Sequence, residues 1–327
     1  MSLAVITGAS GLLGANLAES LIAAGHRVRA TKRATTKIDH LGDLAIEWVE
    51  GDLDDVAALT RAFEGADVVF HCAAAVSVQK DVSPELERTN VAGTANVIEA
   101  MRASKAKRLV HTSSVVALGL SDDGNPVDET VVWNFDKHDL ADGYAITKHR
   151  AEELVRAATD LDFVIVNPAW MCGPRDSRPS SGKLIVELAR RKVPGWTPGY
   201  NNFADVRDVA RGMIAAWQRG RRGERYFLGG HEMTYRDFFR TVAKVVGVAP
   251  PRFYMPHFAA RVVGRLGDRR EAKGKPALAN STQVAYAYTN RFRFTAAKAQ
   301  RELGYEIHAL EPAIADAVAW FRARGML

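Results

Sequence analysis

Short apolar runs rich in β-branched residues alternate with stretches of helical spacing through the first half of the chain. The stretch after the first run keeps Leu13, Leu17 and Leu21 four positions apart before Gly25 ends the helix. Such alternation is typical of βαβ units that feed a parallel sheet, so it predicts a Rossmann-type, doubly wound α/β fold. The runs predict strands at Leu3–Thr7, Arg27–Lys32, Ile46–Glu50, Asp67–Cys72, Arg108–Ser113 and Phe163–Pro168.

This regularity weakens after Pro174, where prolines and aromatic residues become frequent. We interpret residues 1–173 as a dinucleotide-binding Rossmann domain. Residues 174–203 and 230–327 are interpreted as a smaller substrate-binding lobe. The two lobes are therefore expected to be interleaved along the chain.

Three later segments carry predictions of their own. A helix over Val206–Trp217 and a strand over Tyr226–Leu228 indicate that residues 204–229 return to the Rossmann domain. The segment 261–276 is rich in Arg, Lys and Gly and is expected to be mobile. Residues 312–324 have the pattern of an amphipathic helix that closes the chain.

The composition is that of an ordinary globular protein, with 47% hydrophobic and 25% charged residues among 327. No apolar run approaches the ~20 residues needed to span a bilayer. The first residues also lack the basic and apolar regions of a signal peptide. We therefore expect a cytoplasmic protein without a membrane partner. Cys72 and Cys172 lack metal-ligand spacing, which favours inert core thiols and no bound metal.

The net charge of +6 comes from basic residues scattered in short groups, such as those at 190–192 and 219–222. They do not form the aromatic-interleaved stripe that is typical of nucleic-acid binding, so we expect no nucleic-acid partner. Solvated surface charge is the simplest explanation. A polyanionic cofactor or substrate is the alternative.

A glycine-rich turn follows the first predicted strand and opens the first helix, which is the context that a dinucleotide-binding turn requires. Gly8 permits the tight turn, Gly11 lets backbone amides approach a pyrophosphate, and Gly14 allows the helix to lie close to the strand. The positive end of the helix dipole favours the phosphates. The predicted cofactor contacts in this turn are Gly8, Ser10, Gly11, Leu12 and Leu13.

The end of the second predicted strand indicates which cofactor binds. NAD-binding chains carry an acid there, but this chain has no acid between Val28 and Asp39. A guanidinium grips a 2′-phosphate, so Arg33, together with Lys37, favours NADP(H). Exposed loop cations and NAD(H) are the alternative. Asp52 and Leu53, just past the third strand, are expected at the adenine edge.

Tyr144 and Lys148 lie four residues apart, so they share one face of a helix. A free tyrosine titrates near a pKa of ~10, and a nearby ammonium makes it a more useful proton donor or acceptor near neutrality. The pair is therefore a candidate for acid–base chemistry. An ordinary helix surface is the alternative.

Taken together, the motifs resemble those of the extended short-chain dehydrogenases/reductases, the superfamily of NAD-dependent epimerases and dehydratases. The Arg33 region and the tail Gly223–Gly230 are most similar to its dihydroflavonol reductase-like branch. The resemblance covers nearly the whole chain. It rests on the glycine turn, Gly51–Leu53, His71–Ala74, Asn90–Thr94, Thr112–Ser114, Tyr144–Lys148 and Asn167–Pro174.

The resemblance implies a role for each matching residue. Ser114, rather than its neighbour Ser113, would hydrogen-bond the substrate carbonyl oxygen, and Tyr144 would protonate it. Lys148 would hold the nicotinamide ribose and favour the tyrosinate. Asn90 would lie near the cofactor, with a helix-surface amide as the alternative. Tyr144 and Lys148, with Ala73, Ala74, Pro168 and Met171, complete the predicted cofactor contacts.

The resemblance also limits the chemistry. Sugar 4,6-dehydratases of this superfamily carry an Asp-Glu pair after the catalytic hydroxyl, whereas Val115 and Val116 follow Ser114. Dehydration is therefore not expected. The pattern Phe-x-His-Val-Asp-Asp appears as Phe203–Asp208, with an added Arg207. The helices that carry Asn90 and Tyr144 commonly pair in this family, which makes a homodimer an expectation.

The leading interpretation is an NADPH-dependent reductase of a ketone or aldehyde on a fairly apolar small molecule. An NAD-dependent nucleotide-sugar epimerase, a sterol-type 3-hydroxy dehydrogenase and a non-catalytic NADP-binding sensor are the alternatives. Substrate identity, direction and stereochemistry are not predicted. The aromatic and apolar side chains that either line the pocket or pack beneath it are Trp170, Met171, Trp196, Tyr200, Phe253, Tyr254, Tyr286 and Tyr288.

Overall fold

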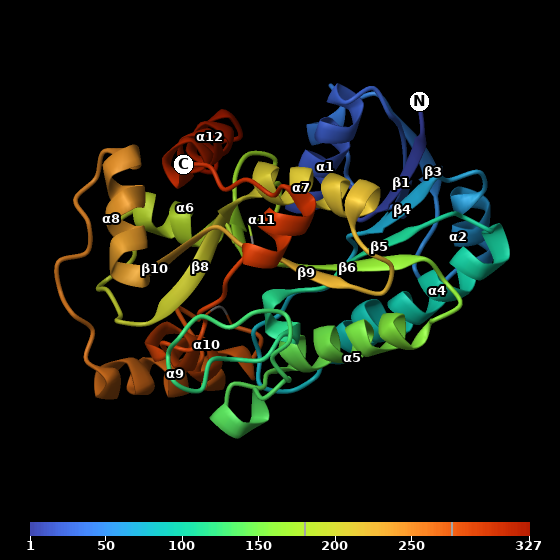
Figure 1. Cartoon of the computed structure of the whole chain (residues 1–327). Helices are drawn as coiled ribbons and strands as arrows, with labels where there is room; N and C mark the ends of the chain where they lie inside the picture. The colour runs from blue at the N-terminus through green and yellow to red at the C-terminus, as the bar shows by residue number, and fades with distance from the viewer. Residues whose placement is uncertain (180, 276) are drawn as a thin grey trace.

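The computed structural model describes residues 1–179, 181–275 and 277–327. Its centre is a parallel sheet of seven strands in the order β3-β2-β1-β4-β5-β6-β9 (Figure 1). The predicted α/β fold is confirmed, and each predicted strand is present, with the fourth and fifth one residue shorter at each end. The strands are β1 Leu3–Thr7, β2 Arg27–Lys32, β3 Ile46–Glu50, β4 Val68–His71, β5 Leu109–Thr112, β6 Phe163–Pro168 and β9 Arg225–Leu228.

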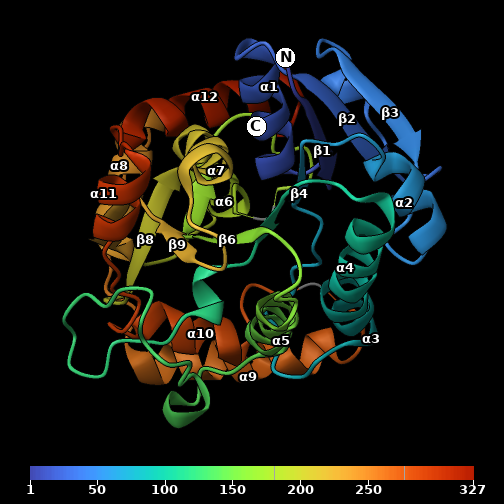
Figure 2. The same cartoon turned by 45° about the vertical axis from the view of Figure 1, so that its right-hand side comes forward.

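Alternate residues of these strands are buried under helices on opposite faces of the sheet. Ile6 and Phe70 pack in the cluster that includes helices α1 and α7, whereas Val5 and Val69 pack in the cluster that includes α2 and α4. Burial on both faces explains why the inner strands β1, β4, β5 and β6 are mostly apolar. The covering helices are α1 Leu12–Ala23, α7 Val206–Arg219, α2 Val56–Phe63, α4 Gly93–Ser104 and α5 Gly143–Ala157 (Figure 2).

A second, three-stranded sheet in the order β10-β8-β7 lies beside the first. Its apolar cluster joins Phe203 of β8 to Phe238 of α8 and to Phe321 of the last helix, α12. The division into a dinucleotide-binding domain and a substrate lobe stays a prediction. The elements of this part are β7 Trp170–Cys172, β8 Tyr200–Asp205, β10 His231–Thr234, α6 Lys183–Ala189, α8 Tyr235–Val246, α11 Ala297–Leu303 and α12 Leu310–Ala323.

The segment expected to be mobile is mostly a helix, and its mobility stays a prediction. Helix α9, His257–Glu271, packs against α10, Ser281–Tyr288. A Cβ atom at Gly267 would collide with the carbonyl oxygen of Ala279, so this glycine serves close helix packing. Pro276, at the end of the expected segment, lies outside the described residues.

Short helical turns complete the chain. A π-helical turn joins the brief helix α3 to α4, and such turns often mark functional positions. Of the helices that the structure describes, none is both long and apolar enough to cross a membrane. The turns are Asp39–Leu41, α3 Pro84–Leu86, the π-helical Glu87–Ala92, Val115–Ala117 and Asp136–His138.

Candidate active site

The glycine turn between β1 and α1 packs closely against its neighbouring backbone. Gly8 has a φ of 77°, and a Cβ atom there would lie 2.5 Å from the amide nitrogen of Ala73. A Cβ atom at Gly14 would collide with the carbonyl oxygen of Gly8. Helix α1 follows Gly11 without a side-chain cap or an acid in its first turn, so its first amides stay available. This cradle fits a dinucleotide pyrophosphate.

The loop that follows β4 forms the other wall of this turn. The amide of Ala73 donates to the hydroxyl of Thr7, at 3.4 Å. Asn90, in the π-helical turn, accepts from the amide of Ala75 at 2.8 Å and donates to its carbonyl oxygen at 3.0 Å. Asn90 is buried, so the alternative of a helix-surface amide is wrong. Its amide fixes the path of the chain just after Ala73 and Ala74.

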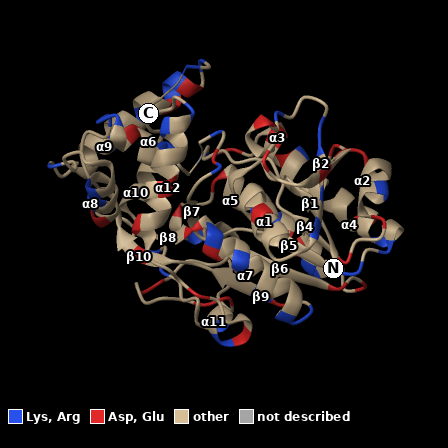
Figure 3. Ribbon diagram, turned by 90° about the horizontal axis from the view of Figure 1, so that it is seen from above, with Lys and Arg blue, Asp and Glu red and all other residues tan. Residues whose placement is uncertain are grey.

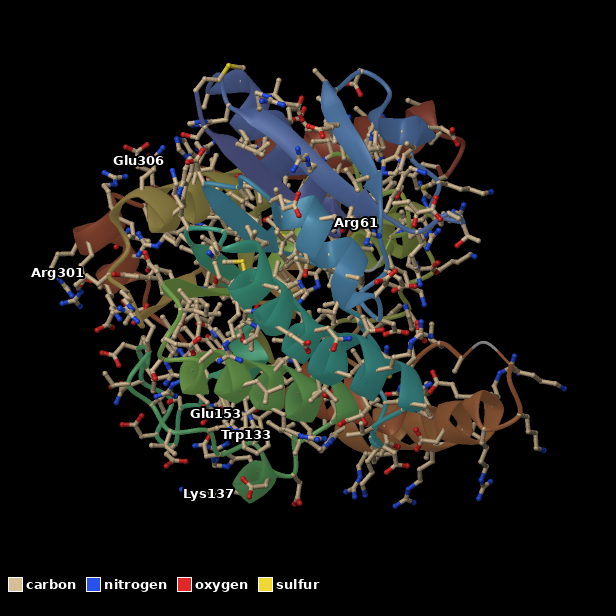
Figure 4. All side chains as sticks on the ribbon, turned by 90° about the vertical axis from the view of Figure 1, so that its right-hand side faces the viewer. Arg61, Trp133, Lys137, Glu153, Arg301 and Glu306 are labelled. Carbon is tan, nitrogen blue, oxygen red and sulfur yellow. The ribbon has the colours of Figure 1, made fainter. Side chains whose placement is uncertain are left out.

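Arg33, at the end of β2, lines a hollow of about 430 Å³ together with Arg61 of α2. Figure 4 shows Arg61 on α2, beside the strands of the sheet. Lys37 is exposed and is not among the described residues that line this hollow. Acidic side chains line it too, so its charge is mixed. They are Glu50, Asp52 and Asp55.

The expected adenine-edge residues follow β3 directly. Asp52 lines the same hollow as Arg33, and its carboxylate lies 3.8 Å from the guanidinium of Arg88. Leu53 is half-buried, and a Cβ atom at Gly93 would lie 2.9 Å from its side chain. Leu53 therefore packs closely on the start of α4.

Helix α5 presents both Tyr144 and Lys148. Asp142 caps the helix by accepting from the amide of Ala145 at 2.6 Å. The ammonium of Lys148 is buried and donates to the carbonyl oxygen of Thr112 at 2.7 Å. Burial lowers the pKa of Lys148 to about 8, against the opposing effect of Glu152.

Ser114 and Tyr144 come together from β5 and α5. Burial raises the pKa of the Tyr144 phenol, and a hydrogen bond with the Ser114 side chain opposes that rise. The phenol is therefore protonated at neutral pH and can donate. Ser114 also begins the turn Val115–Ala117, where its hydroxyl accepts from the amide of Val116.

A buried ion pair behind Ser114 is a feature that the sequence did not predict. The amide of Asn167 donates to the carbonyl oxygen of Ser114 at 3.1 Å and to Glu152 at 2.7 Å. Arg225 of β9 lies 3.0 Å from the other oxygen of Glu152. Glu152 follows Lys148 by four residues on one helix face, which was the only sequence signal of the network.

Two further predicted contacts lie at the end of β6. Pro168 is buried in that strand, and Met171 is half-buried in β7. Several of the aromatic residues expected near a pocket instead pack on their neighbours. Trp170 lies edge-on against Phe203 at 5.1 Å between ring centres, and Trp196 contacts Tyr254 at the same spacing.

The arrangement joins a phosphate cradle, a protonated phenol, a serine hydroxyl and a buried ammonium at the carboxyl edge of a parallel sheet. This is where doubly wound sheets bind nucleotides. Among the described residues, no group of histidines, cysteines and carboxylates has the arrangement of a metal site. The fold and the cradle therefore define a dinucleotide-binding enzyme of the Rossmann class.

Comparison with known proteins identifies the family. Residues 4–229 match the model of the NAD dependent epimerase/dehydratase family. The chain belongs to this family, and it is an NAD(P)-dependent enzyme of the oxidoreductase and epimerase kind, as the resemblance implied.

Three curated relatives match along nearly their whole length. The chain is 35% identical to a putative dihydroflavonol 4-reductase of Synechocystis over 98% of this chain and 94% of the relative. It is 34% identical to sterol demethylase protein B of Methylococcus capsulatus, over 99% of both chains. A 4-hydroxy-2-methyl-3-oxo-4-farnesyl-3,4-dihydroquinoline-1-oxide ketoreductase of Stigmatella aurantiaca is 33% identical over 92% of this chain and 90% of the relative.

Two solved structures share the fold along the entire chain. The structure of gox2253 has a TM-score of 0.85 and 32% identity, and the match covers 100% of both chains. The structure of PA4631, described as a nucleoside-diphosphate-sugar epimerase from Pseudomonas aeruginosa, has a TM-score of 0.81 and 26% identity. That match covers 100% of this chain and 99% of the other.

Proposed function

We propose that the protein is an NADPH-dependent reductase of a ketone or aldehyde carried on a fairly apolar small molecule. The observation that carries this proposal is the placement of Tyr144 and Lys148 one turn apart on α5, with the ammonium of Lys148 bonded to the carbonyl oxygen of Thr112, two residues before Ser114. A carbonyl oxygen placed against both hydroxyls would receive a hydrogen bond from Ser114 and a proton from Tyr144. Reductases of this kind need both groups on one oxygen.

In the proposed reaction, Tyr144 gives its proton to the carbonyl oxygen as negative charge develops there. Ser114 donates a hydrogen bond to the same oxygen. The charge of Lys148, one helical turn from Tyr144, stabilises the tyrosinate that remains. A bound nicotinamide would supply the hydride for this chemistry. In the reverse direction, the tyrosinate takes the proton from an alcohol.

The cofactor would lie across the glycine turn, with the pyrophosphate on the free amides that follow Gly11 and the nicotinamide near Pro168 and Met171. The preference for NADP(H) rests on Arg33. Arg61 strengthens it, because two guanidinium groups share the hollow beyond β2. The acids in that hollow favour a ribose hydroxyl instead, so NAD(H) is the alternative.

The apolar character of the substrate is supported by two relatives. One is named for sterol demethylation and another is a ketoreductase of a farnesyl-bearing quinoline. Both names describe bulky apolar molecules. A sterol-type 3-hydroxy dehydrogenase would use the same three side chains in the oxidative direction.

A nucleotide-sugar epimerase is the second candidate, favoured by the match to PA4631. An epimerase keeps its cofactor and returns the hydride to its own product. Two measurements separate the candidates, namely the nucleotide released by denaturing the purified protein and NADPH consumption with a panel of carbonyl compounds. The reductase proposal predicts NADPH consumption with at least one apolar ketone or aldehyde. Tightly held NAD, with no NADPH consumed, would contradict it and support the epimerase.

A further inference from the structure

Helix α9 turns its large apolar side chains toward solvent. Phe258, Val262 and Leu266 are 74%, 55% and 51% exposed, and their spacing of four residues places them on one face. Phe253 and Leu278, which precede and follow the helix, are 75% and 64% exposed. We call the exposed side of α9, with Phe258, Val262, Leu266 and the arginines described below, the α9 face.

The opposite side of the helix is made of small residues. Ala260, Gly264 and Gly267 are buried, with Gly264 close to Ser281 of α10 and Gly267 close to Ala279 just before it. In a helix whose apolar residues only stabilise the fold, the large ones face the core. Here the large ones face outward while alanine and glycine face inward, so the α9 face is not explained by packing within the chain.

Positive charge is concentrated on the same segment. Residues 252–278 contain seven Lys or Arg and two Asp or Glu, which is five of the six positive charges in excess over the whole chain. Both acids point toward α10, because Asp268 accepts from the amide of Ser281 at 2.9 Å and Glu271 accepts from Asn280 at 3.1 Å. Neither acid forms an ion pair with Arg261, Arg265 or Arg269.

The arginines on the α9 face also lack partners elsewhere in the described part of the chain. Arg261, Arg265 and Arg269 are exposed, and no ion pair joins any of them to a described carboxylate. Elsewhere arginines such as Arg102 lie within 2.8 Å of an acid, and both signs of charge occur together on α7 and α11 (Figure 3). The α9 face is thus both apolar and positively charged.

We propose that the α9 face binds the surface of an anionic phospholipid bilayer. Guanidinium groups pair with lipid phosphates, while Phe258 and Leu266 enter the boundary between headgroups and acyl chains. A second copy of the chain is the less suitable partner, because a symmetric contact would bring the arginines of both copies together. Binding of this kind needs no membrane-spanning helix among the described residues, because a helix bound to the bilayer surface lies in the plane of the membrane.

The α9 face is connected to the candidate active site through α10. Asn280, which caps α10, donates to the carbonyl oxygen of Val78 at 2.6 Å, and the hydroxyl of Tyr286 donates to Asp142 at 2.9 Å. A bilayer that contacts α9 would therefore be separated from Val78 and Asp142, near Tyr144, only by α10. The proposal goes beyond the reductase function and does not depend on it.

The test is sedimentation of the full chain with vesicles of phosphatidylcholine alone and of phosphatidylcholine mixed with phosphatidylglycerol in equal parts. We expect binding to the anionic vesicles only. The combined change Arg261→Ala, Arg265→Ala and Arg269→Ala should weaken it on the order of 100-fold. Phe258→Ser with Leu266→Ser should weaken it at least about tenfold. Arg→Lys at the same three positions should retain binding.

Val132→Ser is the matched apolar control, because Val132 is 80% exposed and lies on another segment. It should leave vesicle binding unchanged. Circular dichroism of each variant establishes that it is folded. Absence of binding to the anionic vesicles, or equal binding by folded Phe258→Ser with Leu266→Ser, would overturn the proposal. Self-association of the chain that the same pair of changes abolishes would assign the face to a second copy instead.

Discussion

Tyr286 and Asp142 connect the C-terminal part of the chain to the helix that carries Tyr144. The hydroxyl of Tyr286, on α10, donates to a carboxylate oxygen of Asp142 at 2.9 Å. The other oxygen of Asp142 caps α5 two residues before Tyr144. The position of the candidate proton donor therefore depends on a residue that comes 142 positions later in the chain.

Removing the Tyr286 hydroxyl should weaken this connection without removing a proposed catalytic group. Tyr286→Phe leaves one oxygen of a buried carboxylate without its donor, which costs about 1 to 3 kcal/mol in free energy of unfolding. Urea denaturation measures this loss. Tyr254→Phe, at a 47% exposed tyrosine, is the control and should change the free energy of unfolding little. Equal stability of the two variants would show that the Tyr286–Asp142 bond contributes nothing.

The pKa of Asp142 predicts a pH dependence of stability. Burial raises this pKa from 3.8 to about 6, so the folded protein holds the proton more tightly than the unfolded chain. The favourable contribution is complete below pH 3.8 and is lost as the pH rises through about 6. Asp142→Asn cannot ionise and keeps a capping side chain. Relative to the original protein, its free energy of unfolding should therefore rise with pH across this window.

Urea titrations on both sides of pH 6 measure the difference between the two proteins. Asp160→Asn is the control, because the pKa of Asp160 is shifted in the opposite direction. The side-chain hydrogen bond from Arg102 lowers that pKa to about 2. Because the Asp160 carboxylate is exposed, its ion pair should add little to the free energy of unfolding, and only at a pH above its pKa in the folded protein. A pH-independent difference between Asp142→Asn and the original protein would contradict the raised pKa of Asp142.

The buried pair of Glu152 and Arg225 should behave as a unit. Their side chains are 1% and 17% exposed, so Arg225→Met leaves a buried carboxylate without its cation. That loss should cost about 3 to 5 kcal/mol in free energy of unfolding. Adding Glu152→Gln removes the unpaired charge and should recover part of the loss. Denaturant unfolding of the single and double variants checks this, and a double variant less stable than Arg225→Met would contradict it.

Arg33 should discriminate between the two nicotinamide cofactors. Arg33→Ala should raise the KM for NADPH by roughly 10- to 100-fold and change that for NADH much less, because a charged hydrogen bond to the 2′-phosphate is lost. Arg61→Ala should act in the same direction. Lys37→Ala is the matched comparison and should have the smaller effect, since Lys37 does not line the hollow that holds Arg33. Equal effects of Arg33→Ala on both cofactors would exclude Arg33 as the phosphate ligand.

The main sheet could be predicted because its signals are local. Each strand is a short β-branched run, and the turn at Gly8 follows the first strand directly. The packing of α9 was not predicted, since Gly267 permits contact with Ala279, a residue of another segment. The residue pattern of a single segment does not indicate which other segment of the chain it will pack against.

The supporting contacts of the site could not be predicted for a related reason. The partners Glu152 and Arg225 lie 73 residues apart, and Asp142 and Tyr286 lie 144 apart. Such pairs form only when the fold brings distant elements together. Tyr144 and Lys148 were visible in the sequence because helical spacing alone places them on one face.

The most direct test of the proposed reductase is the turnover of NADPH by Tyr144→Phe with a carbonyl compound that the original protein reduces. The change removes only the phenolic proton donor, so we predict turnover lower by roughly 100- to 10,000-fold. Binding of NADPH, measured by its fluorescence, should be nearly unchanged. Normal turnover by folded Tyr144→Phe would contradict the assignment of Tyr144 as the proton donor.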